Sequence, residues 1–283
     1  MMADVAVLSA DSMGGRRIGT GGSERARAFL VGKFRQLTLD SLAPGFVQPF
    51  DAPWTDGTTI RGQNIIGRVR GTRAPDDYVV VSAHYDHLGT TAEGVFHGAD
   101  DNASGVAGLL AIAAWFVAHP PEASLLFVLF DGEEAIQAGS RSFLAHHFIT
   151  VAAIKVNINL DMIGRSRSDV VNVVGTNRFP ALRPFVSRIA AGSAIRLRLG
   201  HDTGSVESAD NWIGQSDQAS FAALGIPFLY FAVDLHQDYH RVTDTVERIQ
   251  PAFLSQTIGV ILDIVREVEH AVALRTPLAS RPP

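Results

Sequence analysis

Short apolar runs alternate along this chain with longer stretches in which apolar residues recur every three or four positions. The short runs are rich in β-branched residues and predict strands at 65–69, 79–83, 125–130, 154–160 and 227–231. The longer stretches predict a helix that starts with Ser23 as its N-cap, and further helices at 104–116, 140–148, 181–191, 219–224 and from Pro251 onward. The chain is therefore expected to alternate between strands and helices.

This alternation predicts the fold class. The run 79–83 is almost continuously apolar, as expected for a central strand that is buried on both faces. Strands that alternate with helices favour a mixed, largely parallel central sheet with helices on both faces, in an α/β fold. We find no internal repeat and no linker, so we expect residues 1–283 to form a single catalytic domain with a flexible tail at 277–283.

Composition narrows the classes of partner. The formal net charge of −5 and the scattered basic residues argue against a nucleic-acid partner. The longest apolar run, 106–118, is too short for a membrane span. The first residues lack the pattern of a secretory signal, which leaves a cytosolic protein or a mature form without its leader. The chain has no Cys, so a bound metal would need ligands from His, Asp and Glu.

Such ligands gather in five short segments, namely 84–86, 98–102, 131–134, 159–161 and 239–240. Four of the five directly follow a predicted strand or lie just beyond one. Because ligands bind outside the carboxyl ends of strands in an open α/β sheet, we expect these segments to converge there. A pair of metal ions needs one bridging carboxylate, further ligands for each ion, and a free carboxylate as proton acceptor.

The residues leave several roles open at this point. Asp101 or Asn102 could cap the helix that follows, and capping by one acid of this loop would not exclude a metal role for the other acid. Of the adjacent Glu133 and Glu134, one is expected to bind metal while its neighbour acts as general base.

The order of these motifs resembles the co-catalytic di-zinc aminopeptidase family, which has a zinc-exopeptidase, phosphorylase/hydrolase-like fold. The resemblance runs from about Leu8 to Arg266 and is carried by the motifs His84-x-Asp86, 98–105, Glu133-Glu134, 159–162 and Tyr239-His240. That family is related to glutamate carboxypeptidase, glutaminyl cyclase and the transferrin receptor. Many relatives carry a protease-associated domain, for which this chain has no room before His84.

The resemblance implies two Zn²⁺ per chain and a role for each motif. Asp100 would bridge both ions, His84 and Asp161 would complete one ion, and Glu134 and His240 would complete the other. Glu133 would be the general base, Asp86 would support His84, and Tyr239 would donate to the substrate carbonyl. The resemblance also implies a cis peptide bond between Asp100 and Asp101. It favours a secreted or periplasmic location, with the cytoplasm left open.

We therefore predict a zinc-dependent aminopeptidase that acts on peptides with a free N-terminus, in an oligomeric state that the sequence leaves unknown. The alternatives are a carboxypeptidase or dipeptidase of the same family, a single-zinc glutaminyl-cyclase-like acyl transferase, and a metal-free binding module. Four further histidines are expected to be solvated or to line the substrate pocket: His87, His97, His201 and His236. Asp217 is expected to support the site or to cap a helix.

Overall fold

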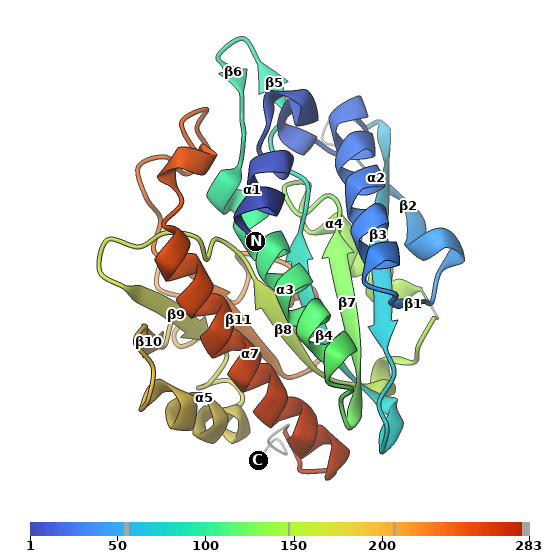
Figure 1. Cartoon of the computed structure of the whole chain (residues 1–283), viewed down its shortest axis with the longest axis vertical. Coiled ribbons are helices and arrows are strands. Elements are labelled where there is room, and N and C mark those ends of the chain that lie inside the picture. The colour runs from blue at the N-terminus through green and yellow to red at the C-terminus, as the bar shows by residue number, and fades with distance from the viewer. Residues whose placement is uncertain (54–56, 147, 206–207, 279–283) are drawn as a thin grey trace.

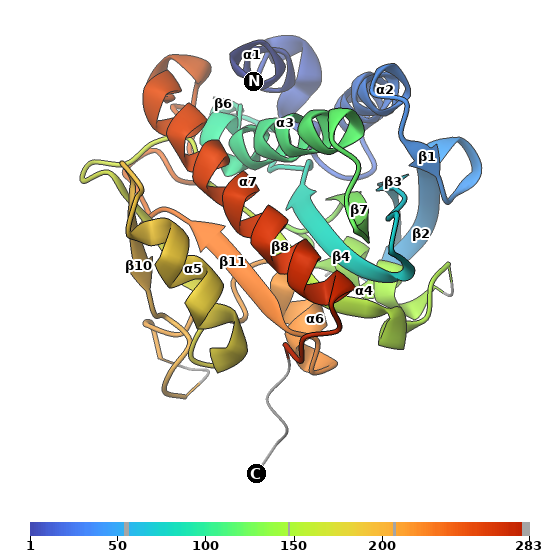
Figure 2. The ribbon, with the colours of Figure 1, turned by 60° about the horizontal axis from the view of Figure 1, so that its bottom comes forward.

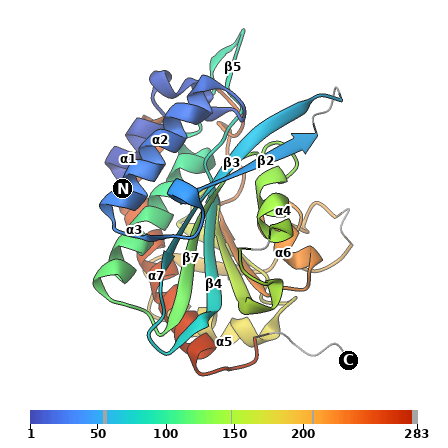
Figure 3. The same ribbon diagram turned by 90° about the vertical axis from the view of Figure 1, so that its right-hand side faces the viewer.

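The protein folds into three layers, a central sheet between two layers of helices (Figures 1 and 3). The structure is a computed structural model, and it describes residues 1–283 except 54–56, 147, 206–207 and 279–283. Helices α1, α2, α3 and α7 lie on one face of the sheet, while α4 and α6 lie on the other (Figure 3). The helix bounds are α1 (Met2–Leu8), α2 (Gly21–Gln36), α3 (Gly105–Ala118), α4 (Ala138–Ala145), α5 (Arg183–Ala190), α6 (Gln218–Ala223) and α7 (Pro251–Ala273).

The main sheet has nine strands in the order β1-β3-β7-β4-β8-β11-β9-β10, with β2 paired to β3. Their bounds are β1 (Asp40–Ser41), β2 (Val47–Pro53), β3 (Thr59–Val69), β4 (Ala74–His84), β7 (Ala123–Phe130), β8 (Ile154–Leu160), β9 (Val170–Val174), β10 (Arg196–Leu199) and β11 (Phe228–Ala232). The four central strands β7, β4, β8 and β11 run parallel, and β3 and β9 join them antiparallel. Their carboxyl ends therefore meet at one edge, which is where the predicted ligands lie. A separate hairpin pairs β5 (Thr90–Thr91) with β6 (Gly94–Val95).

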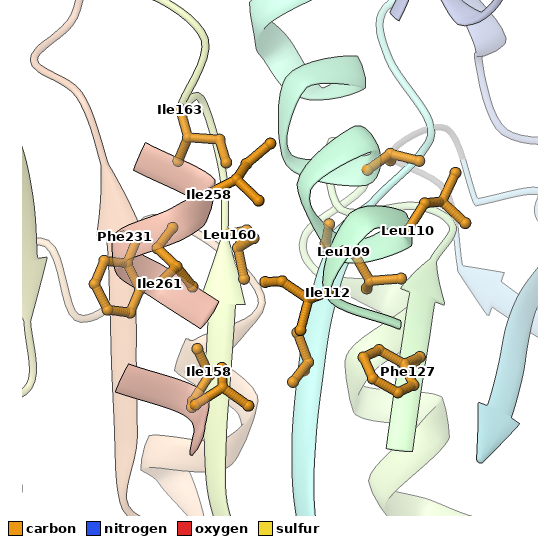
Figure 4. Close-up of a cluster of buried hydrophobic side chains, with 14 of the residues drawn as sticks. Leu109, Leu110, Ile112, Phe127, Ile158, Leu160, Ile163, Phe231, Ile258 and Ile261 are labelled. Atoms are coloured by element: carbon orange, nitrogen blue, oxygen red, sulfur yellow. The ribbon is translucent and has the colours of Figure 1, made fainter. Parts of the chain in front are cut away.

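The central strands send alternate side chains into two cores. In β7, Leu125, Phe127 and Leu129 face the large cluster beneath α3 and α7, part of which Figure 4 shows. The intervening Leu126, Val128 and Phe130 face a smaller cluster with Phe143 of α4 and Phe221 of α6. Because successive side chains of a strand point to opposite faces, a strand buried on both sides must be apolar throughout. This explains the continuous apolar runs of β4 and β7.

The structure confirms the predicted mixed α/β class and contains every predicted helix and strand. The sequence patterns missed α1 and the outer strands, because short or partly exposed elements carry little periodicity; β10, for example, reads Arg-Leu-Arg-Leu. The N-cap of α2 is Thr20 rather than Ser23, and its hydroxyl accepts from the Ser23 N–H at 3.4 Å. Half of the pairings in the main sheet are antiparallel, so the sheet is parallel mainly at its centre.

Two further predictions concern the apolar helix and the tail. The segment Ala99–Ala118 is long and apolar enough to cross a membrane, but 72% of its apolar window is buried inside the fold (Figure 2 shows α3 beside α7 on the sheet). Most of its apolar surface is thus covered by the protein. Leu278 is also buried, so the predicted flexible tail packs on the fold as far as that residue. The rest of the tail, 279–283, lies outside the described residues.

The packing of α7 generates a first prediction. Ile261 is fully buried against Ile158 and Phe231 of the central strands (Figure 4). We expect Ile261→Ala to lower the free energy of unfolding by about 2–5 kcal/mol, because the deletion leaves a cavity in a close-packed core. Urea unfolding measures this change, with Gln256→Ala on the exposed side of the same helix as the control. A loss below 1 kcal/mol, as is typical of surface positions, would contradict the described packing.

Candidate metal centre

The predicted ligand segments converge at the carboxyl edge of the central strands. His84 is the last residue of β4, Asp131 directly follows β7, and Asp161 directly follows β8. These three strands are neighbours and run parallel, so their ends lie side by side. Beyond β11, which runs parallel to β8, the chain continues to Tyr239 and His240 and reaches the same place.

Two groups of side chains meet there, and Asp101 belongs to both. His84 Nε2 lies 3.4 Å from Asp101 Oδ1 and 3.3 Å from Asp161 Oδ1. On the other side, His240 Nε2 lies 3.2 Å from Asp101 Oδ2 and 3.4 Å from Glu134 Oε2. The two oxygens of a single buried carboxylate thus face two different groups of potential ligands.

The prediction that Asp100 occupies this central position is corrected to Asp101. The carboxylate of Asp100 points elsewhere, accepting from the Gly164 N–H at 2.7 Å and lying 3.0 Å from His236 Nε2. The cis peptide bond likewise joins Asp101 to Asn102, not Asp100 to Asp101. Adjacent residues in this irregular turn direct their side chains apart, and the sequence shows two acids without showing which one faces the site.

Hydrogen bonds from neighbouring strand ends fix this turn. Asn102 donates to the Leu160 carbonyl at 2.9 Å, and its own side-chain oxygen accepts from Gly105 and Met162. Asp244 accepts from the N–H groups of both Asp100 and Asp101. The turn is thereby tied to the end of β8, and this connection brings Asp101 close to Asp161.

A buried arginine, Arg16, binds the main chain of the same loops. The Arg16 guanidinium is fully buried and donates to five main-chain carbonyls, those of Leu8, Tyr85, His97, Gly98 and Asp101. Burial lowers the pKa of Arg16 to about 10, against the effect of the carboxylates of Asp101 and Asp244, so the group stays charged at neutral pH. Gly98 is required here, since a Cβ atom at its position would lie 2.7 Å from Arg16 Nη2 and 2.1 Å from the Asp101 carbonyl oxygen.

Asp86 lies between His84 and the main chain of Glu133. Its Oδ1 accepts from the Glu133 N–H at 3.0 Å. The same oxygen lies 3.7 Å from His84 Nδ1, whereas the Asp86 main-chain carbonyl is closer at 3.2 Å. The Asp86 carboxylate thus lies near both His84 Nδ1 and the start of the Glu133 turn, and it contributes to raising the pKa of His84.

The adjacent glutamates have opposite electrostatic environments. Burial raises the pKa of Glu133 well above its usual value, and the carboxylates of Glu134 and Asp217 raise it further. Burial also acts to raise the pKa of Glu134, but hydrogen bonds with His240 and His87 outweigh it and hold the value at about 2. Glu134 is therefore ionised, while Glu133 has a high affinity for a proton.

The imidazoles respond to the same carboxylates. Although burial lowers it, the pKa of His240 rises to about 10 because Asp101 and Glu134 pair with its cation. The pKa of His84 is raised well above 6.5 against the effect of burial, chiefly by Asp161 and Asp101. The buried acids thus favour a positive charge on both imidazoles.

The two groups open into a cavity of about 290 Å³. The described residues that line it are His84, Asp101, Glu133, Glu134, Asp161, Met162, Gln215, Tyr230, Leu235, Tyr239 and His240. Tyr239 stacks on His240 with ring centroids 3.8 Å apart. Asp100 does not line the cavity, whereas all the other predicted metal ligands do.

The four further histidines have different surroundings in the structure. His236 contacts Asp100, His97 contacts the Ser9 carbonyl, and His201 stacks on Trp212 while its Nδ1 pairs with Asp210. The prediction for His87 is wrong, because its side chain is fully buried against Glu134. In the sequence, only its position directly after Asp86, on the same loop as His84, indicated that His87 could lie at the site.

Asp217 and Asn159 lie behind the cavity. Asp217 is fully buried, and burial raises its pKa to about 7. Asn159 donates to Ser216 and Gln218 and so holds the segment that leads into α6. These contacts favour a supporting role for Asn159, and the side chain of Asp217 makes no N-cap hydrogen bond to α6.

The donor set fits zinc. Zinc prefers imidazole nitrogen and carboxylate oxygen in the absence of thiolates, and it neutralises carboxylates that are costly to bury unpaired. Two triads, His84–Asp101–Asp161 and His87–Asp101–Glu134, each bring their ligand atoms within 4.8 Å of one another. Both triads share Asp101.

Known proteins share this fold. The zinc aminopeptidase BSAP from Bacillus subtilis superimposes with a TM-score of 0.76 at 18% identity, over 94% of each chain. A glutaminyl cyclase from Porphyromonas gingivalis superimposes equally well, with a TM-score of 0.76 at 21% identity, over 94% of this chain and 96% of that one. At these identities the likeness shows the fold, and it does not distinguish the two activities.

The alignments with sequence relatives cover only part of each relative. Aminopeptidase YwaD of Bacillus subtilis is 29% identical over 224 residues, which is 74% of this chain and 45% of YwaD. A probable zinc metalloprotease of Pyrenophora teres f. teres is 27% identical over 199 residues, or 64% of this chain and 41% of the relative. The chain thus spans less than half the length of these relatives.

The location of the chain stays a prediction. A vacuolar membrane protease of Schizophyllum commune is 33% identical over 97 residues, which is 34% of this chain and 10% of the relative. The predicted secreted or periplasmic location is not tested by these relatives.

A family model matches most of the chain and shows the family to which it belongs. The model of peptidase family M28 matches residues 64–265, a span that includes every residue of both groups from His84 to His240. The chain therefore belongs to peptidase family M28.

Proposed function

We propose that this protein is a zinc-dependent aminopeptidase that binds two Zn²⁺ per chain and hydrolyses the N-terminal peptide bond. The observation that carries the proposal is the position of Asp101, whose two oxygens face His84 on one side and His240 on the other at 3.4 and 3.2 Å. A carboxylate with both oxygens engaged in this way is what two neighbouring ions require of a bridge.

The proposed ligands follow from the two groups. Asp101 would be shared by both ions, His84 and Asp161 would hold one, and Glu134 and His240 would hold the other. Bound zinc would lower the pKa of a water molecule and polarise the scissile carbonyl. Because the imidazoles hold protons in the absence of metal, zinc must displace those protons, and its affinity rises with pH.

Glu133 is the proposed general base. It lines the cavity, and its high proton affinity suits a group that takes a proton from water and later gives it to the leaving amine. The Asp86 carboxylate holds the Glu133 main chain, and Tyr239 can donate its hydroxyl proton to the developing oxyanion. Asp86 and Tyr239 are thus positioning and stabilising residues.

The charge of the cavity favours an aminopeptidase over a carboxypeptidase or dipeptidase. Among the described residues that line it, none is Lys or Arg, so a C-terminal carboxylate would find no fixed cation. Acidic side chains can hold the α-ammonium group of a peptide. YwaD and BSAP are named as aminopeptidases, which agrees with this choice.

A panel of aminoacyl amides tests the proposal. We expect the zinc-loaded protein to hydrolyse amides with a free α-amino group and to leave N-acetylated forms intact, because the acidic cavity recognises the ammonium group. Amine release measures both, and glutaminyl peptides in the panel would reveal cyclisation. Preferred cleavage of blocked substrates, or cyclisation without hydrolysis, would contradict the proposal.

The role of Glu133 gives a further prediction. Glu133→Gln removes the proton acceptor while keeping size and hydrogen-bonding shape, so kcat should fall by about 100- to 10,000-fold. Zinc content, measured by atomic absorption, should stay unchanged, and the exposed Glu93→Gln serves as the matched control. Retained turnover would remove Glu133 from the role of base.

The corrected bridge is tested by a pair of neighbouring substitutions. Asp101→Asn should reduce the affinity for both ions, because a neutral amide cannot bridge two cations. Asp100→Asn should keep both ions, since Asp100 contacts Gly164 and His236 outside the two groups. Zinc content after dialysis compares them. Loss of zinc from a folded Asp100→Asn variant, with retention by Asp101→Asn, would reverse the assignment.

A further inference from the structure

His87 is the buried group that the proposed function leaves without a role. It follows His84 by three residues, and its side chain has no exposed surface. Its Nδ1 lies 2.8 Å from Glu134 Oε1 and 3.8 Å from Asp101 Oδ2. Both partners belong to the group that His240 completes.

We propose that His87 is an additional protein ligand of the zinc ion held by Asp101, Glu134 and His240, and that it binds through Nδ1. This assignment rests on the proposed two-ion function and adds to it. It gives that ion four protein side chains, whereas the ion of His84 and Asp161 has three with the shared Asp101.

The spacing of the donor atoms supports the assignment. In a tetrahedral zinc shell with bonds of about 2.0–2.1 Å, neighbouring ligand atoms lie roughly 3.3 Å apart. The distances from His87 Nδ1 to Glu134 and Asp101 are 2.8 and 3.8 Å. Those from His240 Nε2 to the same two carboxylates are 3.4 and 3.2 Å; both imidazoles approach Asp101 Oδ2, while His87 faces Oε1 of Glu134 and His240 faces Oε2. The spacing around His84 has the same size, at 3.3 and 3.4 Å.

The two imidazoles approach this group from different directions. Their ring centroids are 5.9 Å apart, and their planes form an angle of 65°. A Cβ atom at Gly98 would lie 2.6 Å from Cδ2 of His87, so the loop backbone packs closely against that edge of the ring. The ring is thus fixed with Nδ1 toward the carboxylates.

A hydrogen bond to Glu134 is the competing role for His87. This hydrogen bond would use Nδ1 as a donor and would explain the 2.8 Å contact with Glu134. It does not explain why Nδ1 also lies 3.8 Å from Asp101. Among the described residues, Nε2 has no hydrogen-bond partner. Zinc on Nδ1 would place the proton on Nε2, so this unpaired nitrogen is common to both roles, and the approach of Nδ1 to both Asp101 and Glu134 is what favours the metal.

The assignment makes the two ions unequal. A zinc ion with four protein ligands is closed in the manner of structural sites, while one with three keeps a position open for water or substrate. We therefore expect the ion of His87 to be held more tightly.

Zinc titration of the metal-free protein tests the proposal without measuring activity. Asn at position 87 keeps an N–H that can reach Glu134 but is a poor zinc ligand. We expect His87→Asn to weaken one of the two zinc sites by more than about 1000-fold, beyond the roughly 10–100-fold cost of losing an outer hydrogen-bond partner. The matched control is His270→Asn, because His270 Nδ1 also lies 2.8 Å from a glutamate oxygen, that of Glu122, on the exposed surface. Its two affinities should equal those of the wild type.

X-ray absorption at the zinc edge supplies a second readout that needs no variant. The wild-type protein loaded with two ions should show three imidazoles shared by two zinc ions, and His87→Asn should show two. Two imidazoles in the wild type, or a His87→Asn affinity within 100-fold of the wild type, would overturn the assignment and leave His87 as a positioning residue. A wild type that binds only one zinc ion would instead contradict the two-ion function, and with it this assignment.

Discussion

Negative charge gathered in a buried space is the constraint on which the rest of the site depends. Asp101, Glu134 and Asp161 meet at the edge of the sheet, and the cations that contact them are imidazoles. Unpaired carboxylates are expensive to bury, so this arrangement is stable only with bound cations or bound protons. Burial raises the pKa of Glu133 and the neighbouring carboxylates raise it further, and the same negative charge would favour zinc and an ammonium group in the proposed function.

The protein holds these acids in place with hydrogen bonds to the main chain of the loops that carry them. Arg16 directs its fixed charge to main-chain carbonyls of three segments, so it orders the loops without pairing with the ligand carboxylates. Asn102 and Asp244 bind main-chain groups of the turn that carries Asp101. Ligands held in this way are preorganised, and metal binding then requires little movement of the main chain.

Neighbouring residues of the same type take different roles in this site. Asp100 and Asp101 are adjacent acids in one turn, yet only Asp101 reaches the imidazoles of His84 and His240. Glu133 and Glu134 are adjacent in another turn, and their pKa values move in opposite directions. Side-chain direction and local charge separate the members of each pair, and both depend on contacts from distant parts of the chain.

The sequence by itself determined the α/β class, the central strands and the kinds of ligand. Burial on both faces requires continuous apolar runs in β4 and β7, and the lack of Cys leaves only His, Asp and Glu as strong metal ligands. Tertiary structure alone decided which acid stands between the two groups, and it turned His87 from an expected solvated residue into a buried one. The physical reason is that periodicity reports which face of an element is buried, whereas the direction of a side chain in an irregular turn is set by hydrogen bonds to residues far away in the sequence.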